Sequence, residues 1–313
     1  MSETINSIAF QDNYISWVQA EVTGGQSVSI KRVAEGPLPF ILNYDNLQKT
    51  TTALQIANQL KGMAEKAEFS SENVRFLLSA RMGFVKKVLV DQFIPENQYL
   101  SLIKAELNYI LTSPVEEFIV YQPDYERELS GMKELLAVAI RKQIYEFTRQ
   151  IAREAGFQLS QMNLNCFAID EIFRKFFPNV IGQTLLVNFT ERGLEFILSD
   201  EKNFLNFTFK PYTRSMLPID QLNTADVFSV FEKALQDFQK MAEEDSSAYS
   251  ITQVFLFGYY FKSDWLGTLR DKCQLPLRVF NPLESTEWQV LSEDENLDVT
   301  NAYRFVEPLS NIF

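Results

Sequence analysis

Residues Leu135–Asp170 read LLAVAIRKQIYEFTRQIAREAGFQLSQMNLNCFAID and carry the clearest pattern of secondary structure in the chain. Apolar periodicity and the helix-stop residues Gly156 and Pro178 predict, in order, a strand at Glu134–Ile140, a helix at Lys142–Ala155, a strand at Phe157–Leu164 and a helix through Phe177. Strands that alternate with helices are typical of an α/β fold, in which helices flank a mixed sheet.

The same order of elements occurs on both sides of this stretch. Each half of the chain predicts three strands, then a helix, then a fourth strand. In the first half these are the strands Ile5–Phe10, Tyr14–Glu21 and Ser27–Ala34, the helix Leu47–Met63 and the strand Val74–Leu78. In the second half they are the strands Thr184–Phe189, Leu194–Leu198 and Phe204–Lys210, the helix Ile219–Met241 and the strand Ile251–Phe257. Ser7 and Leu186 hold comparable places, an offset of 186 − 7 = 179 residues. This repeat predicts a duplicated fold with two lobes.

Length and composition set limits on the function. A chain of 313 residues is long enough for two cores. The net charge of -12 argues against nucleic acid as a partner and against electrostatic docking to a membrane. Without histidine, the chain cannot form a Ser-His-Asp or Cys-His catalytic system. We find neither a signal peptide nor an apolar stretch long enough to span a bilayer, so we expect a bacterial protein of the cytoplasm without a membrane anchor.

The duplicated order resembles the actin-like ATPases, in particular the pilus-assembly PilM type and the cell-division FtsA type. The resemblance is strongest over Leu135–Asp170 and over Val254–Pro282, VFLFGYYFKSDWLGTLRDKCQLPLRVFNP. It implies a two-lobed, ribonuclease H-like duplicated fold. The N-terminal lobe would cover residues 1–178, with an inserted subdomain at about 83–121. The C-terminal lobe would cover residues 179–313, with a reduced second subdomain.

In this family ATP lies between the lobes, held by two phosphate loops and an adenosine loop. The first loop of the family, D-x-G-x-x-x-[IV]-K, overlays AFQDNYIS, so that Ala9, Gln11 and Ser16 stand at the aspartate, glycine and lysine positions. A shifted register would instead bring Asp12 near the phosphates and put Tyr14 at the glycine position.

The other two loops are also altered. The second phosphate loop, D-x-G-x-x-x-T in the family, overlays NFTERGL, with Asn188, Thr190 and Leu194 at the diagnostic positions. The adenosine loop keeps one glycine, Gly258, which is followed by Tyr259. The resemblance therefore marks Asp12, Asn188, Thr190 and Gly258 as the remaining nucleotide-binding candidates.

These changes favour a protein that has lost ATP hydrolysis, because phosphoryl transfer depends on aspartates that organise Mg²⁺. We expect no catalytic residue, no metal site and no cofactor. The first hypothesis is a non-catalytic scaffold that binds protein partners, with a link to cell-envelope or pilus-type assembly by resemblance alone. The alternatives are a divergent ATP-binding protein or ATPase, which would use Asp12, and a protein that associates with itself.

Overall fold

The computed structural model describes residues 2–47, 49–129, 131–244 and 251–313. Its first sheet has six strands in the order β15-β3-β2-β1-β4-β9. The strands are β1 (Glu3–Phe10), β2 (Tyr14–Thr23), β3 (Ser27–Pro37), β4 (Val74–Leu78), β9 (Leu159–Leu164) and β15 (Gln289–Ser292). The second sheet has five strands in the order β12-β11-β10-β13-β14. These are β10 (Gln183–Phe189), β11 (Gly193–Ser199), β12 (Phe204–Pro211), β13 (Ile251–Phe257) and β14 (Leu277–Val279).

The two sheets repeat one pairing scheme. β1 runs antiparallel to β2 and parallel to β4, and β10 runs antiparallel to β11 and parallel to β13. The last pair before the first turn is Phe10 with Ile15, and the last pair before the second turn is Phe189 with Leu194, which again gives an offset of 189 − 10 = 179 residues. The predicted duplication and the predicted α/β fold are confirmed.

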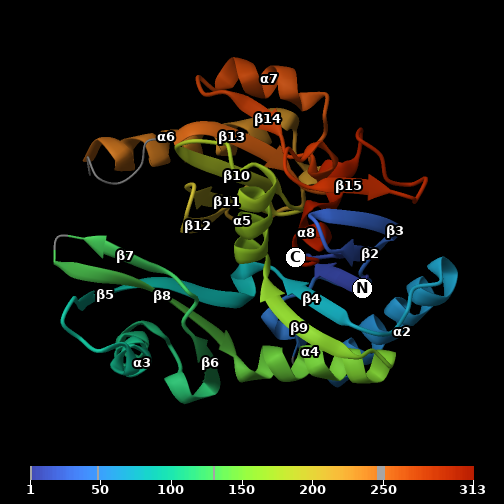
Figure 1. The fold of residues 1–313 in the computed structure, drawn as a ribbon, viewed down its shortest axis with the longest axis horizontal. Coiled ribbons are helices and arrows are strands. Elements are labelled where there is room, and N and C mark those ends of the chain that lie inside the picture. The colour runs from blue at the N-terminus through green and yellow to red at the C-terminus, as the bar shows by residue number, and fades with distance from the viewer. Residues whose placement is uncertain (1, 48, 130, 245–250) are drawn as a thin grey trace.

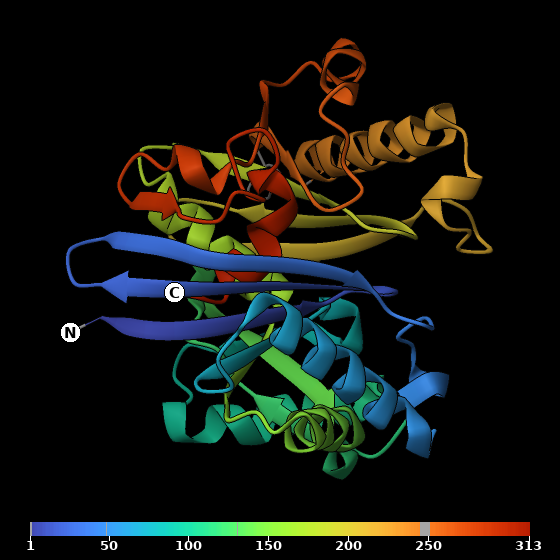
Figure 2. The ribbon, with the colours of Figure 1, turned by 90° about the vertical axis from the view of Figure 1, so that its right-hand side faces the viewer.

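Helices separate and cover the two sheets (Figure 2). α2 (Thr50–Ala67) and α4 (Lys142–Ala155) lie on one side of the first sheet, and the short helix α1 (Tyr44–Leu47) precedes α2. α5 (Asn165–Phe176) lies between the two sheets. α6 (Thr224–Glu244) and α7 (Trp265–Lys272) lie on the far side of the second sheet. Alternation along β10 explains this layering, because Leu186 packs in the core around α5 while its neighbours Leu185 and Val187 pack in the core around α6.

A third sheet forms the inserted subdomain, at the lower left of Figure 1. It joins β5 (Gly83–Asp91), β6 (Phe118–Tyr121) and β7 (Glu126–Leu129) to a central strand, β8 (Met132–Arg141), with α3 (Tyr99–Ile110) on one face. The strand predicted at Glu134–Ile140 therefore exists, but it pairs with β5 and not with the main sheet. The insertion extends to Arg141 and does not end near residue 121. Both faces of β8 are covered, which explains why its sequence resembles a central strand.

The C-terminal residues return to the first sheet. β15 pairs in parallel with β3, and α8 (Val306–Ser310) packs against α5, β1 and β2. Residues 289–313 thus complete the N-terminal lobe, although the sequence analysis assigned all of 179–313 to the other lobe. Among the described residues, no helix combines the length and the apolar character that crossing a bilayer requires.

Candidate functional site

The two hairpin turns of the duplicated strands meet between the lobes. Residues 11–13 connect β1 to β2, and residues 190–192 connect β10 to β11. Asn13 joins the lobes through its side chain, since its Nδ2 donates to Glu191 Oε1 at 2.6 Å and its Oδ1 accepts from the Tyr260 hydroxyl at 3.1 Å. The turns are therefore held together by direct side-chain hydrogen bonds.

Arg81 bridges the two lobes beside these turns. It lies in a short 3₁₀ helix after β4 and donates from Nη2 to Asp12 Oδ1 at 2.6 Å and from Nε to Glu195 Oε1 at 3.2 Å. Its guanidinium carbon lies 4.3 Å from the centre of the Phe209 ring. Burial opposes the charge of Arg81, but Glu195 and Asp12 raise the pKa of its guanidinium above the ordinary value. Two carboxylates, one from each lobe, thus share one partly buried cation.

A second buried carboxylate extends this network to the C-terminal segment. Asn165, the first residue of α5, donates from Nδ2 to Glu195 Oε2 and to Glu307 Oε1, both at 2.8 Å. Gln11 Nε2 donates to the other oxygen of Glu307. Burial, and then the charge of Glu195, raise the pKa of Glu307 to about 7. The raised pKa favours the protonated form of Glu307, which limits its repulsion of Glu195.

Aromatic side chains fill the adjoining part of the cleft. Tyr14 begins β2 and stacks on Tyr259, which follows β13, with ring centres 3.8 Å apart. Arg304 lies over the Tyr259 ring at 4.5 Å and forms an ion pair of 2.8 Å with Glu35. Burial, and then the nearby charge of Glu35, raise the pKa of Tyr14 far above its ordinary value, so its hydroxyl stays neutral. This stack joins the first hairpin turn to the strand end predicted as the adenosine loop.

The structure brings three of the four sequence-predicted residues into one connected set. Asp12 binds Arg81, and Asn188 Nδ2 donates to Glu195 Oε2 at 3.0 Å. Gly258 has φ 114°, and a Cβ added to it would lie 2.3 Å from Asn188 Oδ1. Gly258 is thus required for a close approach between β13 and the second turn.

Thr190 has a different role. Its hydroxyl donates to the backbone oxygen of Gly193 at 2.8 Å, and its own backbone oxygen accepts from the Tyr212 hydroxyl at 2.9 Å. It closes the second turn and forms no hydrogen bond with the set around Arg81.

Four residues of this set were not predicted from the sequence: Arg81, Asn165, Glu195 and Glu307. Glu195 was detectable, because it lies in the otherwise apolar strand GLEFILS. Arg81 was detectable from topology. β1 and β4 are parallel and end side by side, with Phe10 opposite Leu78, so the residues after β4 lie next to the first turn. Asn165 and Glu307 carry no comparable signal in the sequence.

The set is organised for cohesion between the lobes. Its carboxylates accept hydrogen bonds from Arg81, Asn165, Asn188 and Gln11. Asp12 Oδ2 has no hydrogen-bond partner among the described residues. Within the described ranges, no three Asp, Glu, Cys or His side chains are arranged to hold a metal ion.

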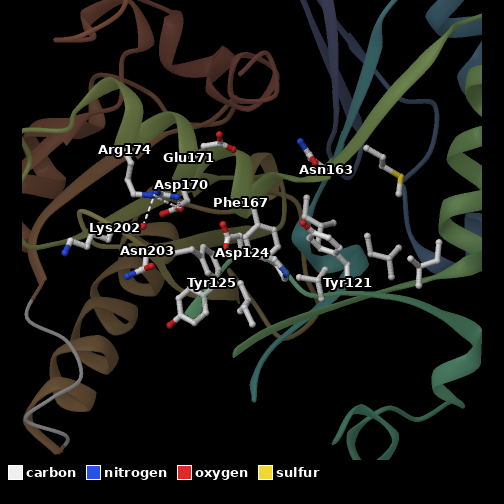
Figure 3. Close-up of a pocket in the computed structure, with 18 of the residues that line it drawn as sticks. Tyr121, Asp124, Tyr125, Asn163, Phe167, Asp170, Glu171, Arg174, Lys202 and Asn203 are labelled. Carbon is white, nitrogen blue, oxygen red and sulfur yellow. Dashed lines mark hydrogen bonds and ion pairs between the residues drawn. The ribbon is translucent and has the colours of Figure 1, made fainter. Parts of the chain in front are cut away.

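An open groove lies on the other side of α5 (Figure 3). It has a volume of about 550 Å³, and its walls come from β6 and β8 of the insertion, from β9 and α5, and from residues 202–204 of the second lobe. Tyr121 lies in this wall with 62% of its surface exposed. Arg174 is held in place by Asp170 at 2.7 Å and by the backbone oxygen of Lys202 at 3.1 Å. The groove is therefore accessible and has both apolar and charged walls.

Comparison with known proteins relates this geometry to one fold. No model of a known protein family matches the chain, and no curated protein sequence matches it significantly. A solved structure of the PilM-PilN type IV pilus biogenesis complex matches with a TM-score of 0.77 at 14% identity, over 98% of this chain and 97% of the other. The chain has the actin-like ATPase fold. EutJ, an ethanolamine utilization protein from Carboxydothermus hydrogenoformans, matches with a TM-score of 0.51 at 10% identity, over 99% of this chain and 89% of EutJ.

The predicted resemblance to PilM-type proteins is thus confirmed at the level of the fold. In this actin-like fold the two hairpin turns and the loop at Gly258 lie between the lobes, where the resemblance predicted them.

Proposed function

We propose that this protein is a non-catalytic actin-like scaffold that binds a partner protein and neither binds nor hydrolyses ATP. The observation that carries the proposal is the Arg81 guanidinium, which bonds Asp12 from the first turn and Glu195 from β11. A magnesium ion requires several oxygen ligands in near-octahedral geometry. Here the carboxylates beside the turns are bound to an arginine side chain instead.

The surrounding side chains do not fit a magnesium-bound triphosphate either. Such loops bring backbone N–H groups close to phosphate by means of glycine. The first turn instead has Gln11 bound to Glu307, and Tyr14 stacked on Tyr259. The carboxylates of Asp12, Glu195 and Glu307 would also repel phosphate. Among the described residues, Arg81 is the one cation that forms ion pairs with this set, and it pairs with Asp12 and Glu195.

The groove beside α5 supports the second part of the proposal. Its apolar and aromatic wall, which includes Tyr121, Ile119 and Phe167, is suited to apolar side chains of an extended protein segment. Charged residues of the lining, among them Asp124 and Lys202, offer contacts for polar groups. The most similar solved structure reported above is a complex of PilM with PilN. By analogy we infer a role in pilus-type or related envelope assembly, on the cytoplasmic side.

Calorimetric titration with ATP and Mg²⁺ tests the inactive cleft and separates it from the alternative of a divergent ATPase. The expected result is no heat of binding up to millimolar nucleotide and no release of phosphate. A PilM-type protein that binds ATP serves as the positive control in the same buffer. Saturable micromolar binding together with phosphate release would overturn the proposal.

Photo-crosslinking tests the groove. A photoreactive phenylalanine analogue replaces Tyr121 in the groove or, as a matched control, Tyr109 on α3, which is 89% exposed and does not line the groove. In the native cell we expect a defined protein adduct from position 121 and none from position 109. No adduct at 121, or equal adducts at both positions, would contradict partner binding in the groove.

A further inference from the structure

A second cavity, of about 520 Å³, lies where three parts of the molecule meet. One wall is the segment Ile41–Leu47 of the first lobe, another comes from the insertion and includes Phe84 and Phe118, and the third contains Arg192 and Met216 of the second lobe. Most of these side chains are apolar. A molecule bound here would contact both lobes and the insertion at once.

Three arginines line this cavity, although the chain as a whole has a net charge of -12. Arg81 is already satisfied by Asp12, the one acidic residue of the lining, and by Glu195. The positive charge available to a ligand therefore comes from Arg141 and Arg192.

Arg141 is held in place but is only partly neutralised. Its guanidinium carbon lies 5.1 Å from the Tyr44 ring and 4.9 Å from the Phe118 ring, so aromatic groups orient it. One nitrogen, Nη1, donates to Ser113 at 3.2 Å and to Glu117 at 3.5 Å. The Glu117 side chain is 57% exposed, so solvent weakens this pair. In the described part of the chain, Nε and Nη2 of Arg141 have no acceptor.

Arg192 is less satisfied still. Its ion pair with Glu191 is 3.9 Å long, and Glu191 also accepts a shorter hydrogen bond of 2.6 Å from Asn13. The Nε of Arg192 is buried, and no described residue accepts its hydrogen. Buried donors normally have a partner, and an acceptor bound in the cavity would provide one for this N–H.

We propose that this cavity binds a small amphipathic organic anion. Its carboxylate would be paired by Arg141 and Arg192, and its apolar body would pack against Leu42, Leu111 and Phe118. Planar guanidinium groups with free N–H donors suit a carboxylate, and the apolar walls disfavour a ligand that is charged throughout. This site is separate from the partner groove and does not depend on the proposed scaffold role.

Isothermal titration with three matched probes tests this assignment. 3-Phenylpropionate carries the carboxylate, 3-phenylpropionamide has the same shape without charge, and 3-phenylpropylamine reverses the charge. We expect saturable binding of the carboxylate to one site and at least tenfold weaker binding of the other two. Equal binding of the amide, or no binding of the carboxylate, would overturn the proposal.

Variants of the full chain assign the binding to this cavity. Arg141→Gln and Arg192→Gln are each expected to weaken 3-phenylpropionate at least tenfold, whereas Arg192→Lys, which keeps the charge, recovers part of the affinity. Arg149→Gln is the matched control, because this arginine lies on α4 with its side chain 59% exposed. Circular dichroism checks that each variant is folded. Unchanged affinity in both glutamine variants would place the bound anion elsewhere and refute the site.

Discussion

The cleft between the hairpin turns and the groove beside α5 both lie where the lobes meet, but they differ in what fills them. In the cleft, Arg81 donates to Glu195, Asn165 donates to both Glu195 and Glu307, and Tyr14 stacks on Tyr259. In the groove, side chains such as Tyr121 remain exposed to solvent. The contrast shows that one fold can use one of its inter-lobe sites for cohesion and leave another free for binding.

This difference has an energetic meaning. A buried ion pair is costly to break from one side, because the remaining charge loses its partner without regaining water. An exposed aromatic side chain contributes little to stability and much more to association. Substitutions in the cleft should therefore act on stability, and substitutions in the groove on binding.

The largest expected effect comes from breaking the cleft at its cation. Arg81→Met leaves Asp12 and Glu195 without their counter-ion, and it should lower the free energy of unfolding by about 3–5 kcal/mol. Urea unfolding measures this loss. The double variant Arg81→Met/Glu195→Gln should recover part of it. Arg149→Met, at an exposed position of α4, is the control and should change stability by less than about 0.5 kcal/mol. If Arg81→Met and Arg149→Met lowered the free energy of unfolding equally, the contacts of Arg81 would not hold the lobes together.

Next in size is the effect of pH through Glu307. Its pKa rises from 4.5 to about 7 on folding, so the stability it contributes is fully present below about pH 4.5 and is lost as the pH rises through about 7. The whole change is roughly 3 kcal/mol. Glu307→Gln does not titrate, so its stability should fall less between pH 4.5 and 7.5 than that of the unsubstituted protein. Parallel pH profiles for the two proteins would contradict this role of Glu307.

A smaller effect is expected at the close approach between β13 and the second turn. Gly258→Ala would force a Cβ against Asn188 Oδ1 at 2.3 Å, in a backbone conformation with φ 114°. We expect a loss of about 1–3 kcal/mol in thermal or urea unfolding. Gly24→Ala is the matched control, since its Cβ would meet nothing within 4 Å. Equal stability of Gly258→Ala and Gly24→Ala would show that the close approach at Gly258 does not require glycine.

The smallest effect on stability belongs to the groove. Tyr121→Ala removes an exposed ring and should change the free energy of unfolding by less than about 0.5 kcal/mol. The same substitution should abolish capture of the protein that crosslinks at position 121. If Tyr121→Ala lowered the free energy of unfolding but still captured the partner protein, the groove would serve stability and not binding, which would contradict the proposal.

The sequence predicted those features that depend on local patterns. Apolar periodicity and the two tight hairpins are local, so the duplication and its offset of 179 residues could be read directly. Because the offset holds, the two turns lie at equivalent places in the two sheets, and Asp12, Asn188 and Gly258 belong to one connected set.

Other features depend on how distant segments pack. Arg81 and Glu195 can each be singled out, but their contact could not be predicted, because they are 114 residues apart and only the packing of the lobes brings them together. β8 has apolar residues on both faces, as a central strand of the main sheet would have, so its place in the insertion was not visible.

The return of β15 and α8 to the first sheet has a consequence for biosynthesis. These segments follow the entire second lobe in the chain, so they leave the ribosome after it. The edge beside β3 and the surface of α5 must remain uncovered until then. The first lobe therefore cannot complete its folding before the second lobe has been synthesised.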